Sequence, residues 1–124
     1  MARWSDRYSE VTYFLLRVVA GLLFAQHGVQ KVFGLLGGKA VPLHSIYGLA
    51  GVLELVGGVL IALGIQAGWV ALILAGEMAV AYFWRHAPRA LFPIQNGGEL
   101  AALYSFIFLY ISARGGGRWR LSGR

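Results

Sequence analysis

The sequence predicts an all-α integral membrane protein, a bundle of four transmembrane helices that forms one domain over residues 1–124. Of the 124 residues, 58% are hydrophobic and only 13% are charged, and the mean hydropathy is +0.65. Such a chain cannot cover itself with an ordinary water-soluble surface. It contains no cysteine, which excludes disulfides, thiol chemistry and iron–sulfur clusters. Any redox chemistry would therefore use a bound cofactor such as a quinone.

The first predicted helix covers about residues 11–33, which is long enough to cross a bilayer with some tilt. It is not expected to be a cleaved signal peptide, because Arg17 lies inside the apolar run and the run ends in polar residues. The second predicted helix covers about residues 46–65. It follows Pro42 and ends near Gly64.

The third predicted helix covers about residues 69–86 and is stopped by Pro88, since proline pushes the residue before it out of the helical region. The fourth covers about residues 98–113, after Pro93, and ends at a run of three glycines. Four spans in one domain follow from these boundaries.

The short link at residues 66–68 requires the second and third helices to form an antiparallel hairpin. Both termini then lie on one face of the membrane. The positive-inside rule assigns that face to the cytoplasm, because it carries more basic residues. The face with the termini carries Arg3, Arg7, Arg114, Arg118, Arg120 and Arg124, and the opposite face carries Lys31, Lys39, Arg85 and Arg89.

Small residues recur at helical spacing in the middle of the chain. One stripe of the second helix contains Gly51, Glu54, Gly58 and Ala62, and one stripe of the third contains Ala71, Ala75 and Ala79. Small residues let helix backbones approach closely in lipid, so tight packing is the favoured interpretation of both stripes. Glu54 is therefore predicted to point into the bundle.

Three of the five acidic residues, Glu54, Glu77 and Glu99, lie in long apolar stretches. A carboxylate near the bilayer centre costs roughly 2.5 to 3.5 kcal/mol on insertion scales, so each should face a partner, a cavity or a pathway. Glu99 begins the fourth helix, where the helix dipole favours an acid, and Asn96 is its predicted N-cap. Capping is one explanation of Glu99, and a ligand role is the other.

The other unusual polar residues converge on the same half of the bundle, near the non-cytoplasmic face. Gln26, His27, Gln30 and Lys31 end the first helix, and Arg85 is placed to reach back toward Glu77. We predict catalytic roles for Glu54, Glu77, His27 and Lys31, and substrate-binding roles for Gln30, Arg85, His86, Asn96 and Glu99. No metal site is predicted.

Several of these residues also have a purely structural interpretation. Lys31 and Arg85 would also serve as anchors that extend to the headgroups, His27 as a hydrogen-bonded buried histidine, and Glu54 and Glu77 as ion-pair partners. Outside this cluster, Arg17 is expected to extend to the cytoplasmic interface or to pair with Glu10.

The basic, glycine-rich tail at residues 114–124 is expected to lie on anionic lipid headgroups. Its position directly after the last helix favours lipid over nucleic acid as its partner, and no nucleic-acid partner is predicted.

The motifs resemble those of the DoxX family. They are HGVQKVFG at residues 27–34, ELVGG at 54–58, AGEMAVAYF at 75–83, HAP at 86–88 and FPIQNGGE at 92–99, and the resemblance covers about residues 11–115. It implies a small four-helix protein of the bacterial inner (plasma) membrane. It also implies kinship with small membrane subunits of a terminal oxidase and thiosulfate:quinone oxidoreductase system, and with members linked to membrane-associated oxidative-stress complexes.

Two functions of different classes follow. In the first, the protein is a quinone-linked redox module or a subunit of a membrane oxidoreductase: His27 and Lys31 donate to the quinone oxygens, Glu54 and Glu77 relay protons, and aromatic residues wall the site. Those aromatic residues are Trp69, Tyr82, Trp84, Tyr104 and Tyr110.

In the second function, the protein is a non-catalytic accessory or assembly subunit of a larger membrane complex. Other membrane subunits or further copies of the chain are expected partners in both, and transport ranks behind them because no inverted repeat is evident.

Overall fold

The computed structural model describes the backbone from Ala2 to Arg124 and the side chains from Ser5 onward. The described chain is all helical. Its long helices are α1 (Ala2–Phe33), α2 (Ile46–Leu63), α3 (Ala67–Ala81) and α5 (Glu99–Arg114). A π-helical turn at Tyr82–His86, a 3-10 turn at Ala87–Arg89 and the short helix α4 (Pro93–Asn96) connect α3 to α5.

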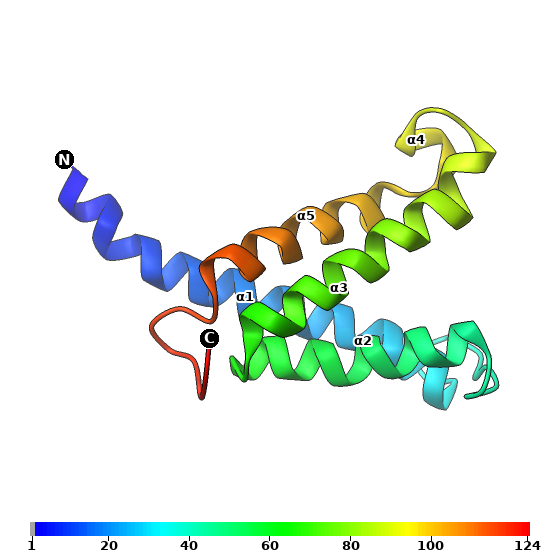
Figure 1. Cartoon of the computed structure of the whole chain (residues 1–124), viewed down its shortest axis with the longest axis horizontal. Helices are drawn as coiled ribbons and strands as arrows, with labels where there is room; N and C mark the ends of the chain where they lie inside the picture. Colours follow the sequence, from blue (N-terminus) through cyan, green and yellow to red (C-terminus); the bar gives the residue numbers. More distant parts are fainter. Residues whose placement is uncertain (1) are drawn as a thin grey trace.

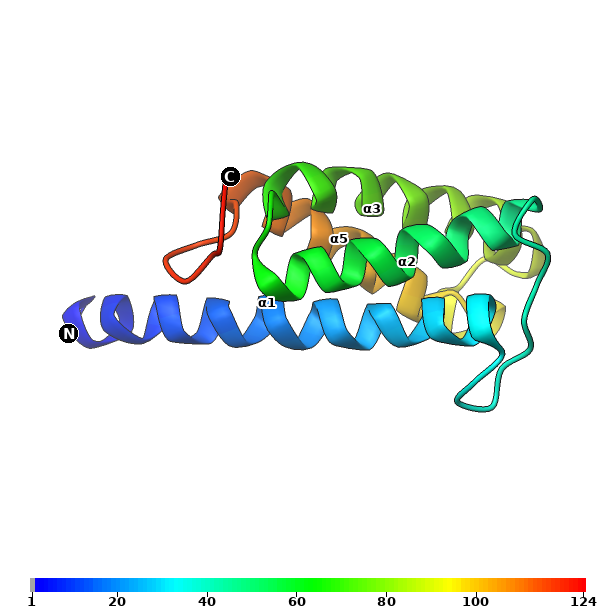
Figure 2. The same cartoon turned by 90° about the horizontal axis from the view of Figure 1, so that it is seen from below.

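The four long helices pack as two pairs. Helix α1 lies along α2, and α5 lies along α3, with the second pair crossing the first (Figures 1 and 2). The N-terminal part of α1 projects beyond the rest of the bundle. Both termini lie toward one end, whereas the α1–α2 loop and α4 lie at the other.

Three of the described helical segments are long and apolar enough to cross a membrane: Ser5–Phe33, Ile46–Leu63 and Ala67–Arg89. Helix α5 is the fourth predicted span, but it has only 16 residues. At 1.5 Å per residue its length is about 24 Å, which is shorter than the hydrocarbon core of about 30 Å.

The observed helix ends differ from the predicted ones where polar residues continue a helix. Helix α1 begins at Ala2 and not near residue 11, because residues 2–10 contain neither proline nor glycine to end the helix. Helix α2 ends at Leu63, followed by Gly64 at φ 72°, a left-handed conformation that glycine adopts without steric cost. Regular α-helix in α3 ends at Ala81, and the π-helical turn continues it to His86.

Glycines bring the backbones of α1 and α2 into contact. A Cβ atom added at Gly28 would collide with the backbone at Gly51 and Leu55, and one added at Gly58 would collide with the backbone at Gly21 and Ala25. We call Gly21, Gly28, Gly51 and Gly58 the glycine seam. The predicted close packing of the Gly51 and Gly58 stripe is thereby confirmed, and its partner is α1.

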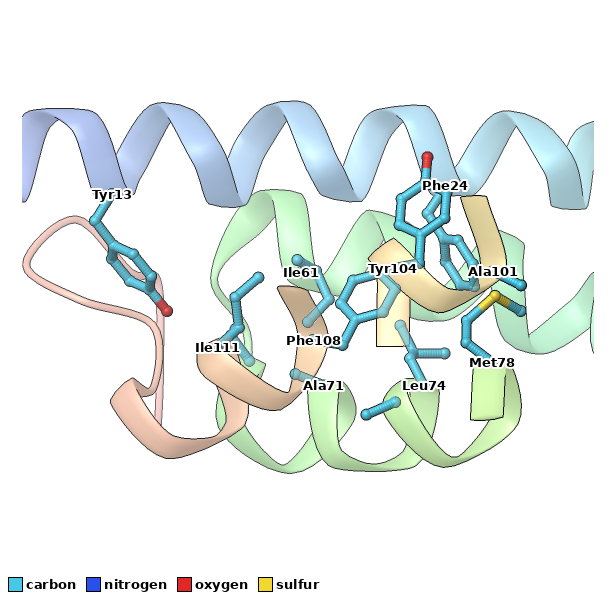
Figure 3. Packing of buried hydrophobic residues seen from close by; sticks show 12 residues of the cluster. Tyr13, Phe24, Ile61, Ala71, Leu74, Met78, Ala101, Tyr104, Phe108 and Ile111 are labelled. Atoms are coloured by element: carbon cyan, nitrogen blue, oxygen red, sulfur yellow. The ribbon is translucent and has the colours of Figure 1, made fainter. Parts of the chain in front are cut away.

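An aromatic core fills the space between the two helix pairs (Figure 3). The Tyr104 and Phe108 rings stack at 11° with centroids 5.6 Å apart, and Phe24 meets Phe108 edge-on at 4.8 Å. Phe24 and Phe108 are fully buried, together with Ile61, Leu74 and Ile111. This core joins α1 to α5.

The C-terminal tail folds back onto the α2–α3 turn. The backbone N–H groups of Leu121 and Ser122 donate to the Gly64 carbonyl, and that of Gln66 donates to the Ser122 carbonyl. We call residues 115–124 the C-terminal cap. Its backbone is held by the bundle, while Arg118 and Arg120 remain exposed.

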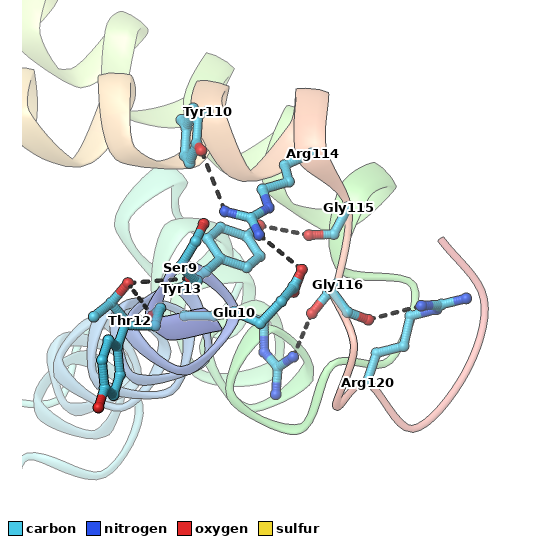
Figure 4. A network of polar contacts seen from close by, with 12 residues as sticks. Ser9, Glu10, Thr12, Tyr13, Tyr110, Arg114, Gly115, Gly116 and Arg120 are labelled. Atoms are coloured by element: carbon cyan, nitrogen blue, oxygen red, sulfur yellow. Dashed lines mark hydrogen bonds and ion pairs between the residues drawn. The ribbon is translucent and has the colours of Figure 1, made fainter. Parts of the chain in front are cut away.

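Arg17 holds this cap, which corrects its predicted role. Its guanidinium donates to the carbonyls of Gly116, Ala62 and Trp119, and only 1% of the residue is exposed. It therefore neither extends to the interface nor pairs with Glu10. Arg114 pairs with Glu10 instead, at 3.0 Å (Figure 4). The prediction failed because the tail carbonyls that satisfy Arg17 reach it only through the fold.

Candidate functional site

A cavity of about 480 Å³ opens among α1, α2, α3 and α5, at the end of the bundle opposite the termini. Its volume lies within the range of small-molecule sites in proteins. The polar and charged side chains that line it are His27, Lys31, Glu54, Glu77, Arg85, His86 and Arg89. Its apolar and aromatic walls include Phe24, Ile46, Tyr47, Met78, Trp84, Leu100 and Tyr104.

An ion pair between Lys31 and Glu54 forms the deep polar end of this cavity. The Lys31 ammonium donates to both carboxylate oxygens of Glu54, at 2.8 and 2.7 Å. Glu54 is only 1% exposed, which confirms that it points into the bundle. Gly51 makes room for this pair, because a Cβ atom there would collide with the Lys31 side chain. The glycine seam therefore lets α1 and α2 approach closely enough for the two charged groups to pair.

Glu77 lies beside this pair on α3. Its side chain lines the same cavity as Lys31 and Glu54 and interacts electrostatically with both. Its buried Oε1 atom has no hydrogen-bond partner among the described residues. Two carboxyl groups thus face a single ammonium. A proton, or a hydrogen-bond donor on a ligand, would balance the excess of negative charge and acceptor oxygens.

Arg85 does not reach Glu77, contrary to the prediction. Its guanidinium lies over the Tyr47 ring, 4.9 Å from the ring centroid. In an unbroken α-helix, positions 77 and 85 would share a face. The π-helical turn at Tyr82–His86 changes the rotation per residue and turns Arg85 toward the first turn of α2. Both residues of this cation–π contact line the cavity.

His27 lines the cavity, and its ring meets Tyr104 edge-on at 6.2 Å between centroids. His86 lines it from the π-helical turn, and its Nδ1 atom lies 3.2 Å from the Asn96 carbonyl oxygen. Because a carbonyl oxygen only accepts, Nδ1 must be the protonated nitrogen in this contact. The connection between α3 and α5 therefore orients His86.

Asn96 is buried but does not line the cavity. Its amide nitrogen donates to the Tyr82 hydroxyl and the Ala90 carbonyl, and its Oδ1 accepts from the Gly98 N–H at 2.7 Å. It was predicted to be the N-cap of the last helix, but Gly98 holds that position. Asn96 ends α4, so its side chain bonds the link between α4 and α5 and not the first turn of α5.

Two further predicted binding residues lie outside the cavity. Gln30 donates through Nε2 to the Leu36 carbonyl at 2.8 Å and so holds the loop after α1. Glu99 lies in the first turn of α5, as predicted, but on a separate surface. Neither is among the residues that line the cavity.

The structure thus brings together all the predicted catalytic residues, and with them Arg85 and His86. It leaves Gln30, Asn96 and Glu99 apart. Sequence reasoning missed Tyr47 as a lining residue, although Tyr47 and Glu54 are seven positions apart and share a helix face. Arg89 was predicted only to be a charge in the flank of the third helix. No local pattern in the sequence shows that the 3-10 turn at Ala87–Arg89 brings this residue to the cavity.

Comparison with known proteins places these residues in a family. The sequence profile of the DoxX family matches residues 12–87, which is more than half of the chain and includes Lys31, Glu54 and Glu77. An uncharacterized protein of Haemophilus influenzae is 40% identical over 121 residues, covering 90% of each chain. No solved structure matches the chain. With its profile match and its three apolar helices, this chain belongs to the DoxX family and is a small multi-pass membrane protein.

Proposed function

We propose that this protein is a quinone-linked redox module of a membrane oxidoreductase and that its cavity binds the quinone head near the periplasmic face. One observation supports this best: a cavity of about 480 Å³ at the end of a membrane-embedded bundle combines Lys31, Glu54 and Glu77 with aromatic walls. A polar cluster in a membrane bundle is costly unless its members pair with one another or serve a ligand or a pathway, and Glu77 has no ion-pair partner among the described residues.

The proposed topology places the protein in the bacterial inner membrane with both termini in the cytoplasm. Helix α5 forms the fourth span, since it lies along α3 and local thinning of the bilayer accommodates a short helix. The cavity then lies on the periplasmic side. The C-terminal cap, with exposed Arg118 and Arg120, faces the anionic headgroups of the cytoplasmic leaflet.

The residues present fit a quinone head. Such a head is flat and apolar, with two carbonyl oxygens that only accept hydrogen bonds. Tyr47, Trp84 and Tyr104 provide apolar surfaces. The Lys31 ammonium has three N–H donors, of which Glu54 engages two, so one remains for a ligand oxygen. His27 adds a ring nitrogen to the same cavity.

When bound, a quinone would supply a carrier for two electrons and two protons. The chain's own residues would orient the head and hold protons. Lys31 and His27 orient the oxygens by donating to them, and the Glu54 and Glu77 carboxyl oxygens carry protons to and from the deep end. The electrons are exchanged with a redox partner, so another membrane subunit belongs to this function.

The second candidate is an accessory subunit without turnover. It is favoured by the position of the Lys31–Glu54 pair, which bridges α1 and α2 directly beside the glycine seam and would hold their register. In this case the pair stabilises a surface on which other membrane subunits, or a second copy of the chain, assemble.

A double substitution separates the two functions. Lys31→Met is expected to destabilise the protein, because the Glu54 carboxylate loses its partner, and to weaken quinone binding by about tenfold or more. Lys31→Met with Glu54→Leu is expected to recover stability, since an apolar pair can replace a buried ion pair, but not quinone binding. The measurements are thermal unfolding in detergent and the amount of quinone extracted from the purified protein.

Lys39→Met is the matched control, because Lys39 is exposed in the α1–α2 loop and should leave both measurements unchanged. Normal quinone binding by the double variant would argue against the redox function. If that variant also failed to assemble with its partners in native membranes, the accessory function would be the one supported.

A further inference from the structure

We propose that the cavity mouth binds an anionic phospholipid and that Arg85 and Arg89 pair with its phosphate. The cavity mouth is the set of residues that line the cavity and are also exposed at the surface between α2 and α3. They are Ile46, Tyr47, Val80, Trp84, Arg85 and Arg89. This site is distinct from the Lys31–Glu54 pair at the deep end, so the inference goes beyond the proposed function and does not depend on it.

The cavity mouth is accessible from the side of the bundle. Helices α2 and α3 are joined by a short turn and diverge from it toward the end that carries α4 (Figure 1). Ile46 begins α2, Val80 lies near the end of α3, and the two arginines belong to the π-helical and 3-10 turns that follow. Both helices are candidate membrane spans. A lipid can therefore reach the opening from the bilayer.

The two arginines of the cavity mouth have no anionic partner. The ion pairs among the residues whose side chains the structure describes are made by Lys31 and Arg114. Arg85 lies over the Tyr47 ring, a contact that orients its guanidinium but leaves the positive charge in place. A guanidinium presents a planar fork of N–H donors that matches the oxygens of a phosphate. Two unpaired arginines at one opening therefore favour a ligand with a phosphate group.

The apolar surface beside the arginines favours a phosphate that carries hydrocarbon chains. The apolar segment Ala67–Arg89 ends with the arginines, and Val80 precedes Arg85 by more than one helical turn. Val80 is 46% exposed and Trp84 is 68% exposed, and both line the cavity. Cations thus stand at the end of the span, at the level of the headgroups, with apolar surface deeper in the membrane. A phospholipid has its phosphate and its chains in the same order.

The charges of the cavity mouth favour a lipid with net negative charge over a zwitterionic one. None of the six residues of the cavity mouth is acidic. The ammonium of a zwitterionic headgroup would find no carboxylate there and would be repelled by the arginines. A headgroup whose only charge is the phosphate avoids this repulsion. Phosphatidylglycerol has such a headgroup, and phosphatidylethanolamine has the zwitterionic one.

The test compares these two lipids with identical short chains. Full-length protein in micelles of a neutral detergent is titrated with each, and native mass spectrometry measures the bound lipid. We expect the wild type to bind one phosphatidylglycerol at least about fivefold more tightly than phosphatidylethanolamine, the scale of one exposed charge interaction. Arg85→Gln with Arg89→Gln should remove this preference. Arg85→Lys with Arg89→Lys, which keeps both charges, should retain most of it.

Arg118→Gln with Arg120→Gln is the matched control. It removes the same charge from exposed positions in the C-terminal cap, at the opposite end of the bundle, and should leave the preference in place. A second control is the chain-free headgroup glycerophosphoglycerol. It should displace the lipid only at concentrations at least about a hundredfold higher, because it gains nothing from the apolar surface.

Equal binding of the two lipids by the wild type would overturn the inference. So would a preference that survives the double glutamine substitution at Arg85 and Arg89, or one that is lost equally in the control from the C-terminal cap. Displacement by the chain-free headgroup at concentrations similar to those of the lipid would show a site for a soluble anion and would overturn the lipid as its occupant. Quinone extraction tests the proposed function separately, so either can fail without the other.

Discussion

Gly58→Leu is expected to force α1 and α2 apart and to destabilise the protein by more than about 3 kcal/mol. Overpacking alone typically costs about 1 to 3 kcal/mol. Here the new side chain would meet the Gly21 and Ala25 backbone, which cannot rotate away as a side chain can. Separation of the helices would also break the Lys31–Glu54 pair. Thermal unfolding in detergent measures the loss, and the amount of quinone extracted from the purified protein should fall.

Gly76→Leu is the matched control for this prediction. Gly76 is also a helical glycine, but a Cβ atom there would contact nothing within 4 Å, so the leucine would extend from the exposed face of α3. The stability of that variant should be unchanged or slightly higher, because leucine favours helix over glycine by about 1 kcal/mol. Equal destabilisation by the two substitutions would show that the glycine seam does not govern packing.

Arg17→Met is expected to release the C-terminal cap and to lower stability by about 3 kcal/mol or more. Three carbonyl oxygens, of Ala62, Gly116 and Trp119, would lose their donor, and each unsatisfied buried acceptor costs about 1 to 3 kcal/mol. Two of these belong to the cap, so trypsin should cleave faster at Arg118 and Arg120. Cleavage time courses and thermal unfolding measure the two effects.

Arg7→Met serves as its control, since it makes the same substitution on α1 at an exposed position. Trypsin cleavage of the cap should then proceed at the wild-type rate. If Arg17→Met left cleavage and unfolding unchanged, the cap would be held by its backbone hydrogen bonds to Gly64 and Gln66 without Arg17.

The helices were largely predictable because their signals are local. Apolar runs longer than about 17 residues predict spans, and proline and glycine end them, so α2 was placed within a few residues. The inward direction of Glu54 was also predictable, since it shares a helix face with Gly51 and Gly58. The start of α1 was not, because hydropathy marks where a helix enters lipid and not where helical hydrogen bonding begins.

The sequence by itself determined that this is an α-helical membrane protein of the DoxX family and that His27, Lys31, Glu54 and Glu77 gather at one end of it. Helical spacing and hydropathy carry that information along neighbouring residues. Only the tertiary structure decided which charges pair. Arg17 bonds a carbonyl that lies 99 positions away in the chain, and a π-helical turn directs Arg85 to Tyr47 and away from Glu77. It also decided that Gln30, Asn96 and Glu99 stay outside the cavity. A polar side chain takes the partner that the fold brings within hydrogen-bonding distance, and spacing along one helix does not specify partners on the others.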